Sequence, residues 1–220
     1  MTNSMEATVK KAADLPGSGQ EPPIRLTRRR LDLILTCFGA LSTLVLLVAG
    51  GLLWWGASFA GGYVSDELAA QNISFPDAAA LSGQGRDDLV ELAGQKVTTG
   101  GQAEAYSSYI AGHVAAIADG ATFADLGVPE RAAKAAVSDA ISSGASADEI
   151  SALEEKAATI TEQRESIFRG EMLRGALLNT FAWDTIGRIA GYAAIAALIA
   201  ATLMLALTIA GLLHLREKQH

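Results

Sequence analysis

The sequence predicts an all-α membrane protein in which two transmembrane helices enclose a small helical extracytoplasmic domain. Two uncharged stretches predict the spans: no Asp, Glu, Lys or Arg lies between Asp32 and Asp66 or between Arg188 and Arg216. These stretches contain 33 and 27 residues, whereas a helix crosses a bilayer core of about 30 Å with roughly 20 apolar residues. Backbone polar groups must be paired in lipid, so helices are the expected form.

Composition limits what the remainder of the chain can be. Half of the 220 residues are hydrophobic, and about 120 residues between the spans leave room for one small domain. The net charge of −7 argues against nucleic acid as a partner. The single cysteine, Cys37, has no second cysteine for an internal disulfide. We interpret it as a small residue facing lipid or another helix, with palmitoylation as the weaker alternative.

The N-terminal region predicts a tail followed by an anchor. Residues 1–26 combine Gly, Ser, Pro and scattered charges, which indicates a disordered cytoplasmic tail. Residues 27–63 form the predicted transmembrane helix 1 and its outer extension, because a fully helical uncharged run is about 50 Å long. The small residues of Ala57–Ala60 leave a cleaved signal peptide as an alternative. The long leader and the long apolar run favour an uncleaved anchor.

The extracytoplasmic domain is predicted to cover residues 64–184. Its beginning is extended, because Ile73 and Phe75 alternate with polar residues and Pro76 stops a helix. A first amphipathic helix follows from apolar residues at steps of three and four, namely Ala103, Tyr106, Ile110, Val114 and Ile117. Gly120 is expected to end this helix.

Two further helices complete the predicted domain. Pro129 can open the first, with a stripe of Ala132, Ala135, Ala136, Ala140 and Ile141. Ser146 and Glu149 form a predicted capping box that opens the second, with a stripe of Ile150, Leu153, Ala157 and Ile160. Gly170 and Gly175 do not forbid a helix, so we expect this last outer helix, straight or kinked, to lead into the second span.

Residues 185–214 form the predicted transmembrane helix 2, and residues 215–220 a second cytoplasmic tail. Small residues about four apart allow close helix–helix contact in lipid. They make the following residues helix-packing candidates: Gly187, Gly191, Ala193, Ala197 and Ala201.

Charge predicts the orientation of the spans. Residues 33–188 contain 9 Lys/Arg and 19 Asp/Glu, whereas Arg25 and a run of three arginines precede the first span. Basic residues flank the cytoplasmic ends of spans, so both termini are expected in the cytoplasm of a multi-pass plasma-membrane protein. Tryptophans and basic residues near the span ends are the expected membrane-interface anchors, namely Arg28, Arg29, Arg30, Trp54, Trp55, Trp183, Arg188, Arg216 and Lys218.

No residue pattern points to chemistry. His113 lies beside the apolar stripe of a predicted helix, and the expected topology separates it from His214 and His220 by the bilayer. Acidic clusters such as Asp87–Asp88 and Glu154–Glu155 lack the spacing of a calcium loop. We therefore predict no catalytic residue, no metal site, no cofactor and no enzymatic activity.

Three segments resemble a group of uncharacterised actinobacterial two-span membrane proteins with a helical extracytoplasmic domain. They are residues 71–76 (QNISFP), residues 95–113 with the runs QKVTTG, QAEAY and YIAGH, and residues 168–179 with FRGEMLRG and LLN. The resemblance covers roughly residues 65–190, and the arginine–glycine–glutamate motif is its most specific part. In overall layout the chain is also similar to a two-span accessory subunit of the actinobacterial cytochrome bc–cytochrome oxidase supercomplex.

Two functions from different classes fit the sequence. The first is a non-enzymatic accessory or scaffolding subunit of a larger membrane complex, for which the small residues in the spans and the absence of catalytic motifs argue. The resemblance implies that its partners, besides the lipid bilayer, are integral membrane proteins such as cytochrome bc or cytochrome oxidase subunits. The alternative is an extracytoplasmic sensor or ligand-binding membrane protein, which the layout of two spans around an outer domain suggests.

Overall fold

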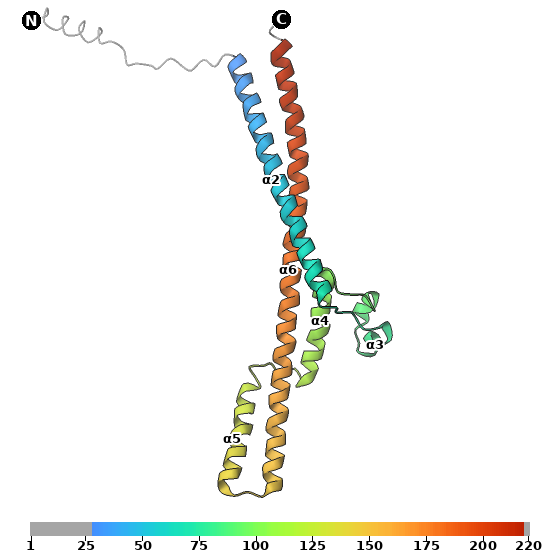
Figure 1. The fold of residues 1–220 in the computed structure, drawn as a ribbon, viewed down its shortest axis with the longest axis vertical. Helices are drawn as coiled ribbons and strands as arrows, with labels where there is room; N and C mark the ends of the chain where they lie inside the picture. Colours follow the sequence, from blue (N-terminus) through green and yellow to red (C-terminus); the bar gives the residue numbers. More distant parts are fainter. Residues whose placement is uncertain (1–27, 218–220) are drawn as a thin grey trace, which may run out of the picture. The chain divides into compact units, whose positions relative to one another are not determined.

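A computed structural model describes residues 28–217 of the chain (Figure 1). The elements are α2 (Arg28–Ala70), α3 (Ala78–Gly83), the 3-10 helix η1 (Asp87–Leu92), α4 (Gly100–Ile117), α5 (Gly127–Ser143) and α6 (Ala147–Glu217). Residues 28–217 form no strand, so the helical class is confirmed there. Helices α2 and α6 are long and apolar enough to cross a membrane by length and composition. The predicted tail of residues 1–26 and residues 218–220 lie outside the described residues.

Both long helices extend beyond the predicted spans. Helix α2 continues to Ala70, seven residues past the end expected at residue 63, and α6 is one helix of 71 residues. Asp66 and Glu67 follow the uncharged stretch and remain helical, since a carboxylate on an exposed helix surface does not interrupt the backbone ladder. The predicted divisions at residues 63/64 and 184/185 therefore fall inside helices.

The chain divides into two compact units. The described part of the first comprises residues 28–45 and 200–217, and the second comprises residues 46–199. In the first unit, α2 and α6 come close together at a glycine. A Cβ added to Gly39 would lie 2.7 Å from Thr208 Oγ1. The buried hydroxyls of Thr36, Thr43 and Thr208 donate to backbone carbonyls four residues earlier. These hydrogen bonds satisfy the hydroxyl groups, whose burial in apolar surroundings would otherwise cost free energy.

In the second unit, α6 is the helix on which the others pack. Helix α5 lies along its beginning and α4 along the following part (Figure 1). Two glycines permit the close approach of α4: a Cβ on Gly170 would collide with the Val114 side chain, and a Cβ on Gly100 would collide with Asp184. Since residues 114 and 100 meet residues 170 and 184 in this order, α4 and α6 are antiparallel. Gln163 Nε2 also donates to the Ile117 carbonyl over 3.2 Å.

The extended segment before α3 is present as predicted. Ser74 and Lys96 form an isolated antiparallel bridge, with the Phe75 amide donating to Gln95 O and the Val97 amide to Ile73 O, each over 2.9 Å. Phe75 is 3% exposed and meets Tyr106 edge to face at 5.3 Å. The buried core of this unit also contains Val64, Leu68, Leu81, Leu89, Val97, Ala103, Tyr109 and Leu177.

Helix ends follow the expected signals, with one addition. Ser146 Oγ accepts from the Glu149 amide over 3.3 Å, which is one of the two hydrogen bonds of the predicted capping box. Gly120 (φ 85°) follows α4 and Gly144 (φ 70°) caps α5, both in the left-handed region that suits glycine. A complete capping box at Thr99 and Gln102 opens α4. This cap was not predicted, although the sequence has the required Thr-x-x-Gln spacing.

The predicted stripe of α5 is wrong at three of its five positions. Ala140 is buried and Ala136 half-buried as expected, whereas Ala132, Ala135 and Ile141 are exposed, and Glu130 and Ala133 are buried in their place. Alanine occurs on nearly every face of this helix. The apolar periodicity therefore does not predict which face of α5 packs against α6. An ion-pair cluster at Glu130 orients the helix instead. The stripe of α4 is confirmed, since Ala103 and Val114 are buried and the other three residues half-buried.

Candidate functional site

The aromatic residues among the predicted interface anchors lie on the surfaces of α2 and α6. In the second unit, Trp54, Trp55 and Trp183 are 54%, 67% and 54% exposed. Trp55 stacks on Phe59 at a centroid distance of 5.9 Å, and Phe59 on Tyr63 at 6.2 Å, so α2 presents an aromatic row. Rings of this kind suit the boundary between lipid and water.

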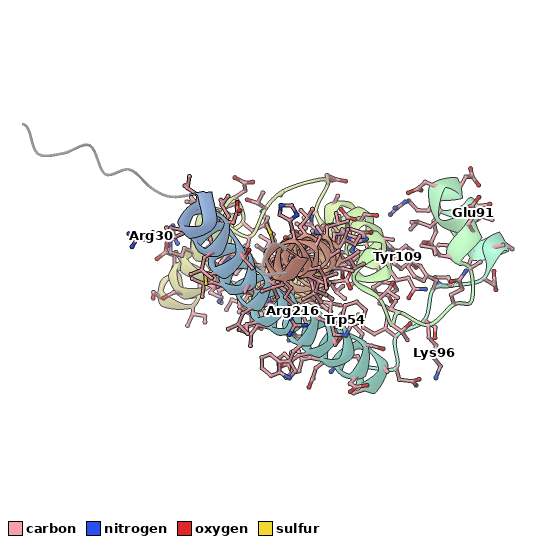
Figure 2. All side chains as sticks on the ribbon, turned by 90° about the horizontal axis from the view of Figure 1, so that it is seen from above. Arg30, Trp54, Glu91, Lys96, Tyr109 and Arg216 are labelled. Carbon is pink, nitrogen blue, oxygen red and sulfur yellow. The ribbon has the colours of Figure 1, made fainter. Side chains whose placement is uncertain are left out.

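The basic anchors divide between the two units. Arg188 lies in the second unit and is exposed, and in the first unit Arg30 and Arg216, both labelled in Figure 2, are exposed. Arg28 and Arg29 begin α2, and their side chains lie outside the described part of the structure. Lys218 lies outside the described residues altogether.

The helix-packing candidates do not form one face. In the second unit, Gly187 is buried, and a Cβ there would lie 3.1 Å from the Ala60 Cβ; one on Gly191 would lie 3.6 Å from the Ala57 Cβ. Ala193 is exposed and Ala197 half-buried, while Ala201 is fully buried in the first unit. Contact residues of α6 that were not predicted are Ala194 and Leu198, both of which lie against Gly50 of α2. Positions 187, 194 and 201 repeat every seven residues, which is the signal that could have found Ala194.

Two grooves of the second unit run between α2 and α6. The first, here the outer groove, measures about 450 Å³ and is lined by Tyr63, Val64, Glu67, Leu68, Gln71, Ile73, Leu173, Ala176, Leu177, Asn179, Thr180 and Trp183. The second, here the interfacial groove, measures about 320 Å³ and is lined by Trp54, Ala57, Ser58, Gly61, Asp184, Gly187, Arg188, Gly191, Tyr192 and Ile195. Both combine aromatic walls with a few polar groups, as binding sites for small molecules do.

Chemistry-bearing residues do not gather in the described part of the chain. Residues 28–217 contain no group of three or more His, Cys, Asp or Glu side chains that could hold a metal ion. His113 is exposed, and its Nδ1 lies 3.1 Å from the carbonyl oxygen of Tyr109, whose ring it also contacts at 4.5 Å. Cys37 is exposed on α2. His113 therefore serves as a boundary residue of α4, and we assign it no reaction.

Charged contacts hold the lobe of α3 and η1 to α4. Arg86 forms an ion pair with Asp88 at 2.8 Å and donates to the Ser108 carbonyl and hydroxyl oxygens over 2.9 and 2.7 Å. The Arg86–Asp88 hydrogen bond raises the pKa of Arg86 and lowers the pKa of Asp88. In Figure 2, Tyr109 belongs to α4, while Lys96 of the connecting segment points away from it. Lys96 Nζ donates to Asn72 Oδ1 over 3.0 Å, so this lobe is tied by local polar bonds.

Among the described residues, Glu130 of α5 is the carboxylate with the most strongly shifted pKa. Its oxygens accept from Lys134 Nζ and Arg164 Nη1, each over 2.7 Å, and from Thr161 Oγ1 over 3.1 Å. The hydrogen bond from Lys134, with those from Thr161 and Arg164, lowers the pKa of Glu130 from 4.5 to about 2, against the opposing effect of burial. Arg164 also lies 3.8 Å over the Phe123 ring and donates to the Phe123 carbonyl over 3.1 Å. The cluster joins α5 and the preceding loop to α6.

We expect Glu130→Gln to destabilise the α5–α6 hairpin at neutral pH and to reduce its sensitivity to acid. A carboxylate with a lowered folded-state pKa contributes stability above its unfolded pKa and loses it as protonation sets in. For Glu130 this loss runs as pH falls from 4.5 to about 2. Thermal midpoints at pH 7 and pH 3 measure the effect. Glu165→Gln, which breaks an exposed pair with Arg169, is the control and should change little; equal effects of both variants would contradict the assignment.

Compared with known proteins, the chain matches no protein-family model, no curated protein and no solved structure. The fold therefore defines the class. The described chain is an all-helical protein with two helices long and apolar enough to cross a membrane. Its second unit carries two grooves and a compact core.

Proposed function

We propose that the chain is a non-enzymatic accessory or scaffolding subunit of a larger membrane complex. The observation that supports this most is an exposed apolar surface N-terminal to the predicted second span. Phe123, Phe168 and Met172 are 39%, 49% and 60% exposed, and the two phenylalanine rings lie 5.5 Å apart. These three residues are here the outer apolar patch.

The composition of the outer apolar patch suits a protein partner. Fully burying one large apolar side chain contributes about 1.5–3 kcal/mol, so three half-exposed ones leave several kcal/mol for a partner to gain. Aromatic residues and methionine are enriched in the cores of protein interfaces. Arg164 and Glu165 border the patch, and such charges at a rim favour one binding orientation. Contact with lipid does not explain the outer apolar patch. The patch precedes the second uncharged stretch by about five helical turns, which places it beyond the bilayer core.

The membrane placement is part of this proposal. We place α2 and α6 across the plasma membrane with both termini in the cytoplasm, on the basis of the arginines at the beginning of α2 and the acidic segment between the spans. Epitope tags at either terminus should be protected from protease in intact, wall-stripped cells. A tag inserted at residues 144–146, in the turn between α5 and α6, should be cleaved. A protected tag at that turn would contradict the placement.

The resemblance in layout directs the search for a partner to the cytochrome bc–cytochrome oxidase supercomplex of actinobacteria. Tagged protein solubilised in mild detergent should co-purify stoichiometrically with subunits of a larger assembly. Phe168→Asp should remove most of this association, since a charge cannot be buried in an apolar interface without a partner. Native electrophoresis and mass spectrometry of the purified material provide the measurement.

Ile141→Asp is the matched control for this experiment. Ile141 is 56% exposed on α5, so the substitution adds the same charge to a similarly exposed apolar position outside the outer apolar patch. It should leave the association intact. Wild-type protein that migrates only as a free monomer or self-oligomer would contradict the accessory-subunit proposal, as would equal effects of the two substitutions.

The outer groove favours a second candidate, an extracytoplasmic sensor or ligand-binding protein. Its volume of about 450 Å³ and its mixed lining of Tyr63, Trp183, Gln71 and Asn179 suit a small amphipathic molecule. This candidate gains support if the protein purifies alone and if a membrane extract raises its thermal midpoint. It loses support if Leu173→Trp, which narrows the groove, leaves that shift unchanged.

A further inference from the structure

The interfacial groove has a polar end and an apolar end. Along α6 the contacts with α2 run from Gly187 beside Ala60 and Gly61 to Gly191 beside Ala57 and on to Leu198 beside Gly50. Asp184 and Arg188 therefore lie at the end of the groove near Gly61, and Ile195 lies toward Trp54. The seven residues from Arg188 to Ile195 span about 10 Å of helix. A polar head followed by about 10 Å of apolar wall is the profile of a lipid.

Glycines in the lining of the groove leave space between α2 and α6. A Cβ added to Gly61 would meet no heavy atom within 4 Å, and one on Gly191 would meet only the Ala57 Cβ at 3.6 Å. The helices touch through Gly187 and Ala60, so the space beside this contact stays free along the helix pair. Trp54, Tyr192 and Ile195 supply its apolar walls, and each of them is about half exposed or more.

Two opposite charges share the polar end. Arg188 Nε lies 3.4 Å from Asp184 Oδ2, and Arg188 Nη2 donates to Thr185 Oγ1 over 3.4 Å. Both distances are long for hydrogen bonds, and the Arg188 side chain is 57% exposed. Asp184 is 20% exposed and packs against Gly100 at the beginning of α4. The carboxylate is thus held in place, while the guanidinium can still donate to a ligand.

We infer that the interfacial groove binds one zwitterionic phospholipid with an ethanolamine head group. Its phosphate accepts from the Arg188 guanidinium, its ammonium donates to the Asp184 carboxylate, and one acyl chain lies along Trp54, Tyr192 and Ile195. An anionic lipid fits less well, because its net charge would meet Asp184 and a segment with 19 Asp/Glu against 9 Lys/Arg in residues 33–188. This inference rests on the membrane placement proposed above.

Lipid retention by the full-length protein tests the inference. The protein is reconstituted in nanodiscs that contain equal amounts of phosphatidylethanolamine and phosphatidylglycerol. It is then released from the nanodiscs, and native mass spectrometry identifies the lipids that remain bound to it. Wild type should retain phosphatidylethanolamine selectively. Gly61→Leu fills the groove and should lower this retention about tenfold. Gly62→Leu is the matched control: its added Cβ also meets open space, yet residue 62 does not line the groove, so it should behave as wild type.

Two charge variants separate the head-group contacts. Arg188→Gln should reduce retention of either lipid, and Asp184→Asn should shift selectivity toward phosphatidylglycerol. Equal retention by the Gly61 and Gly62 variants would overturn the site, and wild-type preference for phosphatidylglycerol would overturn the head-group assignment. Extraction of the protein from membranes by carbonate would overturn the membrane placement itself. A protein that stays in the membrane but retains no lipid would overturn this inference alone.

Discussion

Replacing Leu177 with Ala is expected to lower the free energy of unfolding of the second unit by about 2–5 kcal/mol. Leu177 is 3% exposed and belongs to the core that joins α6 to Val64, Leu68 and the α4 residues. The loss combines the transfer of its side chain with the cavity that remains. Because Leu177 also lines the outer groove, water can enter that cavity, and we expect the lower half of the range.

The adjacent residue provides the control for this substitution. Leu178 is 41% exposed on the same helix, so Leu178→Ala removes the same atoms without opening the core. Thermal unfolding of the full-length protein in detergent should show a fall of about 5–10 °C for Leu177→Ala and little change for Leu178→Ala. Similar midpoints for the two variants would contradict the packing of α6 against this core.

Gly100→Ala is expected to destabilise the same unit by about 1–3 kcal/mol, as overpacking typically does. A Cβ on Gly100 would collide with the Asp184 Cβ and come within 2.7 Å of its Cγ. The Asp184 Cβ is attached directly to the α6 backbone and cannot rotate away as the tip of a long side chain can. The beginning of α4 must therefore move away from α6.

Gly101→Ala is the control for Gly100→Ala. A Cβ at Gly101 would meet no heavy atom within 4 Å, and alanine is favoured over glycine in a helix by about 0.5–1 kcal/mol. This variant should be slightly more stable than wild type, so two neighbouring identical substitutions should have opposite signs. Urea unfolding followed by circular dichroism gives both values. A stabilising Gly100→Ala would show that α4 does not approach α6 as closely as these contacts require.

The predictions that depended on local chemistry agree with the structure. The two uncharged stretches are helical, since each residue pairs its backbone within its own helix whatever surrounds it. Ser146 caps α6 and Gly144 takes the left-handed conformation that ends α5, while Asp119 and Gly120 are both left-handed shortly after α4. The stripe of α4 was predictable because large apolar residues alternate there with polar ones. Topology, anchoring and partnership stay predictions.

The helical class, the two apolar segments and the cap at Ser146 were predictable from the sequence, because periodicity, charge and capping act over a few residues. Features that depend on contacts between distant residues became visible in the folded chain. The ion pair between Glu130 of α5 and Arg164 of α6 orients α5, whose alanine periodicity does not predict the buried face. The folded chain also places Asp184 against Gly100, and it buries Ala194 rather than Ala193. A glycine or alanine has the same local signal whether it faces a helix or solvent, so only the packing partner distinguishes these positions.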